Sequence, residues 1–351
     1  MASHLFKKRL IWRMVIAIGM VIVIVGSTLG SSALVATAAT QPFYVVMDLE
    51  TLGGSSSSAR DINNTGQVVG GTYPSSGAYR AALWDKGKKI DLGTFGGKNS
   101  FAFGINNAGQ VVGRTYTSSD GSRAALWDKG NKIDLGTLGG KDSFAYDINN
   151  AGKVVGYSQT SSGTEHAVLW DKGNITDLGT LDGTESKALG INNAGQVVGY
   201  STTSPFGSHA VIWDKGNLID LGTLGGYYSY GNGINNAGKV VGYSQTSSGA
   251  YRAALWDKGN KIDLGTLFGG GHSIANAINN TGQVVGNSYL TRGWSHPFLW
   301  DNNSIIDLNN LIPPQSGWEL LSAASINDKG QIVGYGEKNG QTRAFLLTPI
   351  K

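Results

Sequence analysis

The chain repeats one pattern of apolar and polar residues at nearly constant spacing. A phrase of the form Ile-Asn-(Asn/Asp)-x-Gly-x-(Val/Ile)-Val-Gly begins at Ile62, Ile105, Ile148, Ile191, Ile234, Ile278 and Ile326. The first five copies are 43 residues apart, and the last two steps are 44 and 48 residues. A period of this length indicates one supersecondary unit copied in tandem.

Within one copy, period-2 alternation predicts four short strands. Residues 100–106 alternate large and small side chains, and the Asn- and Gly-containing stretch 106–109 predicts a tight turn into a second strand at 110–115. A third strand at 123–127 and a fourth at 132–135 follow, separated by another tight turn. The period has no helical pattern. Four antiparallel strands per copy predict a propeller blade.

The two ends of the array predict how it closes. The seventh copy stops after its third strand, 343–347, and lacks the Asp-Leu pair that marks the fourth strand of the six others. The missing strand stands at the other end of the chain, at 44–54, where Asp48 lies 43 residues before Asp91. We therefore predict an all-β, seven-bladed β-propeller over residues 43–349, with four antiparallel strands per blade. The N-terminal strand completes the last blade, which removes two exposed sheet edges.

Several third strands open with His-Ala or His-Pro before an apolar run that ends in Trp. These motifs are Glu165-His166-Ala167-Val168-Leu169-Trp170, Ser208-His209-Ala210-Val211-Ile212-Trp213 and Ser295-His296-Pro297-Phe298-Leu299-Trp300. With the Ile-Asn-Asn phrase, the array resembles the bacterial extracellular repeats named for a His-Ala-Phe signature (HAF repeats), over about residues 43–349. Arg343-Ala344-Phe345 is a variant, and four of the seven copies have Arg in place of the His. The resemblance implies secretion and a propeller fold, and it implies no established activity.

Residues 1–39 lie outside the array and have the pattern of a secretory signal peptide. Four cationic residues up to Arg13 precede an apolar run at 14–25, and Ala36-Thr37-Ala38 suits cleavage after Ala38 or Ala39. The alternative is an uncleaved membrane anchor, because no charge occurs between Met14 and Asp48. The strongly apolar part is shorter than the roughly 20 residues that a membrane span needs. Both readings place the array outside the cytoplasmic membrane, secreted or in the cell envelope.

Charge and cysteine content narrow the classes of partner. Four of the 28 basic residues and none of the 24 acidic residues precede residue 41, so the rest of the chain has 24 of each. A neutral domain has no electrostatic footprint for a phosphate backbone, so nucleic acid is not expected as a partner. The chain has no cysteine, which excludes disulfides and thiolate metal sites. No cofactor and no metal are predicted, since the spacing of calcium-binding loops is also absent.

Two recurring positions have a chemical and a structural interpretation. Each third strand opens with Arg or His and each fourth strand carries one Asp, which fits either a titratable or metal-binding ring or charge-assisted hydrogen bonds within or between blades. Seven equivalent pairs favour the hydrogen bonds. The Trp that closes six of the third strands is expected to pack between blades with its indole N–H satisfied. No catalytic motif stands out from the repeats, so no catalytic residue is predicted.

The candidate binding residues lie where the copies differ, in the loops after the fourth strands and in the first strands. Aromatic rings with amide and charged neighbours near a central channel suit a sugar or a short peptide, by stacking and hydrogen bonding. The alternative is neutral drift of surface positions after duplication. The candidate residues are Arg60, Phe103, Tyr146, Lys187, Tyr228, Tyr230, Asn232, His272, Asn276 and Trp318.

These observations predict a secreted, monomeric, non-enzymatic binding or scaffold propeller for an extracellular glycan or protein. Contact with a membrane is expected only if the signal segment stays uncleaved. The alternative is a hydrolase or lyase with its site on the same rim, and a third option is a structural component of the envelope or matrix. A catalytic role requires carboxylates or His with perturbed pKa values at the channel mouth. A binding role requires converging, exposed aromatic side chains.

Overall fold

A computed structural model describes residues 44–75, 77–118, 121–290 and 295–350. The predicted signal segment, 1–39, lies outside these residues. Residues 41–351 group into one compact unit. In the described part of the chain, no helix has the length and apolarity to cross a bilayer.

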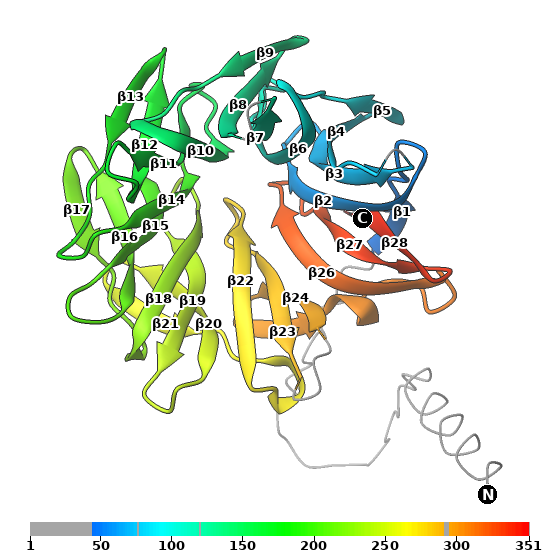
Figure 1. Cartoon of the computed structure of the whole chain (residues 1–351). Coiled ribbons are helices and arrows are strands. Elements are labelled where there is room, and N and C mark those ends of the chain that lie inside the picture. Colours follow the sequence, from blue (N-terminus) through cyan, green and yellow to red (C-terminus); the bar gives the residue numbers. More distant parts are fainter. Residues whose placement is uncertain (1–43, 76, 119–120, 291–294, 351) are drawn as a thin grey trace, which may run out of the picture. The chain divides into compact units, whose positions relative to one another are not determined.

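The strands fall into groups of four, numbered here as blades in chain order (Figure 1). Blade 1 is β2 (Gly54–Ile62), β3 (Val68–Pro74), β4 (Arg80–Asp85) and β5 (Lys88–Asp91). Blade 2 is β6 (Gly96–Ile105), β7 (Val111–Thr117), β8 (Ser122–Asp128) and β9 (Asn131–Asp134). Blade 3 is β10 (Gly139–Ile148), β11 (Val154–Thr160), β12 (Glu165–Asp171) and β13 (Asn174–Asp177).

The later blades follow the same order. Blade 4 is β14 (Ser186–Ile191), β15 (Val197–Thr202), β16 (Ser208–Asp214) and β17 (Asn217–Asp220). Blade 5 is β18 (Gly225–Ile234), β19 (Val240–Thr246), β20 (Tyr251–Asp257) and β21 (Asn260–Asp263). Blade 6 is β22 (His272–Ile278), β23 (Val284–Tyr289), β24 (Ser295–Asp301) and β25 (Ser304–Asp307), with 3₁₀ turns η1 (Leu267–Gly269) before it and η2 (Leu308–Asn310) after it. Blade 7 is β26 (Trp318–Ile326), β27 (Ile332–Lys338), β28 (Gln341–Pro349) and β1 (Tyr44–Asp48).

Within each blade, neighbouring strands pair antiparallel, and the first strand faces the centre (Figure 1). Blades 4 and 5 are joined by one parallel bridge, between Ser208 and Tyr228. Among the described residues, the other four-stranded sets remain separate open sheets, and backbone pairing does not join them into a continuous barrel. The predicted all-β propeller architecture with four antiparallel strands per repeat is confirmed.

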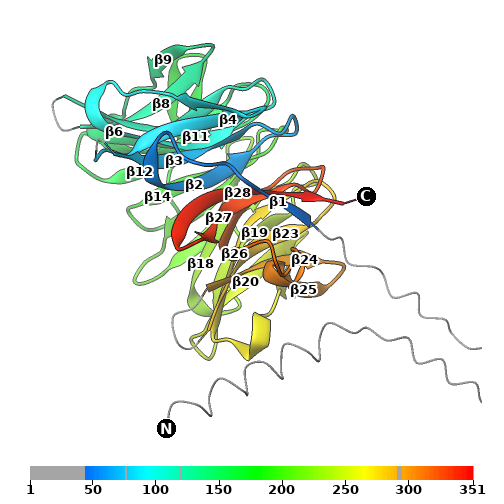
Figure 2. The same ribbon diagram turned by 90° about the vertical axis from the view of Figure 1, so that its right-hand side faces the viewer.

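The N-terminal strand pairs with the last strand of the chain, as the split seventh copy predicts. β1 runs antiparallel to β28, with Tyr44 opposite Pro349 and Asp48 opposite Phe345, and Figure 2 shows the two strands side by side. Tyr44 is buried in a core cluster that includes Leu311 and Phe345. The strand therefore contributes both backbone pairing and apolar burial to blade 7.

The core is distributed between neighbouring blades. One cluster joins Val69 and Ala81 of blade 1 to Ile105, Val111 and Trp127 of blade 2, and similar clusters recur around the unit. The predicted packing of the tryptophans between blades is confirmed. The expectation that their indole N–H groups are satisfied is wrong for five of the six, because those rings are surrounded by aliphatic side chains. In the described residues, five of these N–H groups have no acceptor: those of Trp84, Trp127, Trp170, Trp213 and Trp256.

A buried serine links most blades to the blade before it. In blade 2, Ser100 Oγ accepts a hydrogen bond of 3.0 Å from the Ala81 backbone N–H of blade 1. Six blade junctions have this bond, and the other serines are Ser143, Ser186, Ser229, Ser273 and Ser57. At the remaining junction, the third strand of blade 6 has Pro297 in place of the donor residue, and Pro has no N–H to satisfy. The junction that lacks the serine therefore also lacks the donor.

Candidate functional site

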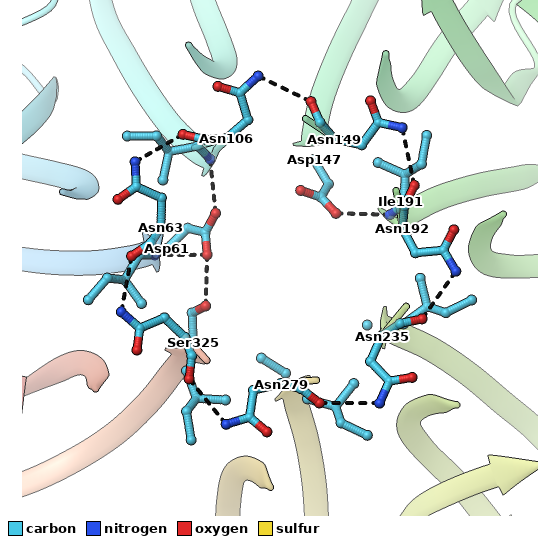
Figure 3. A pocket seen from close by; sticks show the side chains of 18 of the residues that line it. Asp61, Asn63, Asn106, Asp147, Asn149, Ile191, Asn192, Asn235, Asn279 and Ser325 are labelled. Atoms are coloured by element: carbon cyan, nitrogen blue, oxygen red, sulfur yellow. Dashed lines mark hydrogen bonds between the residues drawn. The ribbon is translucent and has the colours of Figure 1, made fainter. Parts of the chain in front are cut away.

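The wall of the central channel is built from the asparagines of the repeated phrase. The first Asn of each phrase is buried, and its Oδ1 accepts N–H groups of its own turn, as Asn149 does from Ala151 and Lys153. Its Nδ2 donates to the backbone oxygen of the same position in the next blade, over 2.9–3.2 Å (Figure 3). The seven bonds run from Asn63 around the channel and return from Asn327 to Asn63.

A second ring of hydrogen bonds lies beside the first. The backbone N–H of Asn64 donates to Oδ1 of Asn107, and the same contact repeats in every blade at 2.9–3.0 Å. In blade 7 the member is Asp328, whose N–H donates to Asn64 and closes the circle. Hydrogen bonds from Asn280 and Asn64 hold the pKa of the Asp328 carboxyl below its usual value, although partial burial opposes them. The tight turns are thus joined to one another around the channel.

Each first strand has a β-bulge two residues before the Ile of its phrase. In blade 1 the ladder skips Arg60, between the pairs Ala59–Gly70 and Asp61–Val69. A bulge adds one residue to a strand and redirects its side chain. The seven skipped residues all line the channel cavity, and they are Arg60, Phe103, Tyr146, Leu189, Asn232, Asn276 and Ala324.

The cavity has a volume of about 290 Å³. Its lining is drawn from the last residues of the seven first strands and from the adjoining turns. Five of the ten candidate residues predicted from the sequence line it: Arg60, Phe103, Tyr146, Asn232 and Asn276. The rings of Phe103 and Tyr146 are 5.5 Å apart, and the Nδ2 groups of Asn232 and Asn276 donate to backbone oxygens of the next blade.

The other five candidate residues lie outside the channel cavity. Lys187 forms an ion pair with Glu165 and lies over the Tyr157 ring, and Tyr230 stacks on Tyr243. Further out, Tyr228 lies at the bridge between blades 4 and 5, and His272 Nδ1 accepts the Tyr251 N–H. Trp318 packs against the core cluster of blade 7, edge-on to Phe345. The predicted residues thus divide between the channel and the body of the blades.

Two carboxylates in the channel wall were missed by sequence reasoning. Asp61 and Asp147 line the cavity, and Oδ2 of each accepts an N–H from the first strand of the next blade, at Ile105 and Ile191 (Figure 3). Each keeps some surface toward the cavity, but the surrounding protein atoms exclude water from most of the group. Burial therefore raises the pKa of Asp61 to about 6 and that of Asp147 to about 7, and the charge of Asp61 adds to the second shift.

A signal for these carboxylates exists in the sequence. Both precede the Ile of their phrase, where the other five copies have Gly104, Gly190, Gly233, Ala277 and Ser325. A charged side chain at a position otherwise occupied by small residues departs from the repeat. Ser325 itself donates a hydrogen bond of 2.7 Å to Asp61, across the junction of blades 7 and 1.

The third-strand cation lies beside the fourth-strand aspartate in five blades, and in three of them the predicted hydrogen bond is confirmed. Three pairs are His–Asp contacts of 2.8 Å, and two are longer Arg–Asp pairs: His166–Asp177, His209–Asp220, His296–Asp307, Arg80–Asp91 and Arg123–Asp134. The prediction is wrong in the other two blades. Arg252 donates instead to the Gly270 oxygen, and Arg343 to Gln341, which leaves Asp48 to pair with Lys338. In the residues that the structure describes, no three His, Asp or Glu side chains gather closely enough to hold a metal ion.

The sequence matches no protein-family model, and no curated protein matches it. The β-propeller domain of the Trilobed protease from Pyrococcus furiosus superposes with a TM-score of 0.57 and 11% identity, over 88% of this chain and 98% of that one. A Mycobacterium tuberculosis puromycin-hydrolyzing peptidase gives 0.51 and 12%, over 89% of this chain and 55% of that one. The BP39L lectin from Burkholderia pseudomallei gives 0.45 and 10%, over 85% and 99%. At these identities the likeness defines only the fold class, a β-propeller.

Proposed function

We propose that this chain is a secreted, non-enzymatic binding module that holds an extracellular glycan or protein at its central channel. In this proposal it is a monomeric HAF-type repeat array, a seven-bladed propeller closed by its N-terminal strand. One observation carries the binding role: seven bulges direct seven side chains of differing chemistry into one cavity. A cationic, two aromatic and two amide groups among them supply charge, stacking and hydrogen bonds to one ligand.

The surrounding wall supports a binding role because it is held in place before any ligand arrives. The two rings of turn contacts fix the backbone on which the bulges stand. A preorganised site loses less conformational entropy on binding than a mobile one. The variable side chains therefore project from a backbone that the same hydrogen bonds fix in every blade.

Binding to cell-wall and exopolysaccharide fractions tests the proposal. The protein without residues 1–39 is expected to be retained on at least one fraction, and Phe103→Ala or Tyr146→Ala is expected to weaken retention about tenfold, since stacking surface is lost. Tyr228→Ala is the control, because it removes an aromatic residue outside the channel. Equal retention of all three variants and the wild type, or retention of none on any fraction, would contradict the proposal.

A hydrolase or lyase is the second candidate, and the two carboxylates of the channel favour it. Asp61 and Asp147 both have pKa values raised by burial, as an acid that works near neutral pH requires. Their oxygens, however, already accept hydrogen bonds from backbone N–H groups, which is a structural role. If the wild type cleaves a retained glycan and Asp147→Asn does not, the enzymatic function replaces the binding one.

A further inference from the structure

A second cavity, of about 240 Å³, lies where blade 7 meets blade 1. β2 and β3 of blade 1 supply most of one side, and β27 and β28 of blade 7 supply the other. The residues that line it are Ser56, Ser57, Ser58, Arg60, Gly71, Tyr79, Tyr335 and Thr342.

The cavity exists because blade 1 has small residues where other blades have large ones. Ser58 of the first strand pairs across the ladder with Gly71 of the second. The same cross-strand pair in blades 2 to 5 is Phe101–Arg114, Phe144–Tyr157, Lys187–Tyr200 and Tyr230–Tyr243. In blade 2 the guanidinium of Arg114 lies 4.6 Å from the Phe101 ring and 4.5 Å from that of Phe144, and these side chains occupy the corresponding space.

The walls of the cavity are held by contacts of their own. Ser57 is buried, and its Oγ accepts a hydrogen bond of 3.0 Å from the Ala344 N–H of blade 7, which fixes β2 against β28. The Tyr79 ring stacks on Phe101 with centroids 5.1 Å apart and meets Tyr73 edge-on at 5.4 Å. The ring is therefore positioned by its neighbours, although 39% of Tyr79 remains exposed.

The residues that line the cavity supply hydroxyl groups and one cationic side chain. Three serines, two tyrosines and Thr342 supply six hydroxyls, and no lining residue carries a carboxylate. Arg60 is exposed at the edge that this cavity shares with the channel, and within the described residues it forms no ion pair. An unpaired guanidinium presents a planar fork of donors that matches a carboxylate.

We propose that this cavity, which we call the junction site, binds one sugar unit that carries a carboxylate, as in a uronic acid. Arg60 pairs with the carboxylate, the hydroxyls of Ser58 and Thr342 exchange hydrogen bonds with the sugar hydroxyls, and the Tyr79 ring supplies apolar surface for the sugar ring. The volume lies below the roughly 300–1,000 Å³ of sites for drug-sized ligands, which limits the occupant to a single unit. The inference rests on the proposed glycan-binding function for its ligand class, but it concerns a different cavity from the channel.

Titration with methyl β-glucuronide and methyl β-glucoside tests the junction site, since the two ligands differ only in the carboxylate. The wild type is expected to bind the glucuronide at least tenfold more tightly, and acetate alone is expected not to bind. Arg60→Gln is expected to remove the preference for the charged sugar. Its side chain is exposed, so the substitution is expected to leave the fold intact.

Filling the junction site separates it from the channel. Ser58→Phe introduces the side chain that blades 2 and 3 have at this position, and Gly71→Tyr introduces that of blades 3 to 5. A Cβ at Gly71 would lie 3.5 Å from Tyr79 and 3.6 Å from the Arg80 oxygen, which are ordinary contacts. Both variants are expected to lose glucuronide binding, while Ile274→Phe, the same position in blade 6, keeps it.

Tyr146→Ala distinguishes failure of this inference from failure of the proposed function. Loss of glucuronide binding in Ser58→Phe and Gly71→Tyr, with retention in Tyr146→Ala, supports the junction site. Loss in Tyr146→Ala alone assigns the ligand to the channel and overturns the junction site, but it keeps the proposed function. If the wild type binds no glucuronide but is retained on a glycan fraction, the junction site again fails alone. If it binds neither, both proposals fail.

Discussion

Two neighbouring rings of residues in the channel wall differ in whether the same residue recurs in every copy of the repeat. The ring of first asparagines, from Asn63 to Asn327, is identical in all seven copies, and each member makes the same contact with the next blade. The ring of bulged residues stands three positions earlier, and it includes Arg, Phe, Tyr, Leu, Asn and Ala. The position that joins every blade to the next is constant, whereas the bulged position varies and only two of its members, Asn232 and Asn276, bond to the next blade. The difference separates architecture from recognition.

The largest effect should come from removing the N-terminal strand from blade 7. Deletion of β1 removes the pairing with β28 and takes Tyr44 and Val46 out of a core cluster. Loss of one buried aromatic residue alone costs about 3–5 kcal/mol, so the melting temperature is expected to fall by about 10 °C or more. Calorimetry measures it, and removal of the last two residues of the chain is the control. A melting temperature equal to that of the wild type would show that blade 7 does not need its fourth strand.

A smaller effect is expected from the two asparagines of a single turn. Asn149→Ala removes one donor to Asn192 and one acceptor for two N–H groups, at a buried position. At about 1 kcal/mol for each bond, the free energy of unfolding should fall by about 2–4 kcal/mol. Asn150→Ala removes one exposed acceptor, the Oδ1 that binds the Asn107 N–H, and should cost below about 1 kcal/mol. Equal costs, measured by denaturant titration, would mean that the buried ring has no special structural role.

A further effect concerns pH, and it comes from the two carboxylates between the rings. Their folded-state pKa values, about 6 and about 7, exceed the value of about 3.9 in an unfolded chain. The folded state therefore binds more protons between about pH 4 and pH 7, so the free energy of unfolding should decrease as the pH rises through that range. Above about pH 7 the difference stays constant. The double substitution Asp61→Asn and Asp147→Asn should reduce this pH dependence.

Urea titrations at pH 5 and pH 8 measure the difference. The matched control is Glu319→Gln with Glu337→Gln, which removes two exposed carboxylates. The control should follow the wild type. If the free energy of unfolding of the aspartate variant also changes with pH as that of the wild type does, the two channel carboxylates are not the source of the pH dependence.

The repetition made most of the fold predictable from the sequence. Because the phrase recurs seven times, the strands, the tight turns and the pairing of β1 with β28 followed from counting positions. The bulges did not follow, since a skipped residue such as Phe103 is defined only by the register of its partner strand. The indole N–H groups were assigned wrongly for a related reason: a recurring Trp reveals its packing, but not the aliphatic environment around its polar atom.

The candidate site was predicted in part, because variation alone does not say where a side chain points. Tyr146 and Trp318 both looked like exposed aromatics of the variable rim, yet the first lines the cavity and the second packs on the core. Asp61 and Asp147 were overlooked, although both lie in first strands, where candidate residues were sought. The sequence did not reveal the junction site. Its space depends on two small residues, Ser58 and Gly71, that face each other on paired strands, and this pairing is known only from the structure.

The seven-membered circuit of Asn amides has neither a first nor a last member. Asn327 donates to Asn63 as Asn106 donates to Asn149, although the first pair is separated by 264 positions along the chain and the second by 43. The contact depends on which blades are neighbours around the channel, and not on how many residues separate the two asparagines along the chain. The polypeptide could therefore be opened at another inter-blade loop and rejoined near residues 44 and 350, and a circularly permuted chain would have the same wall of amides around its axis.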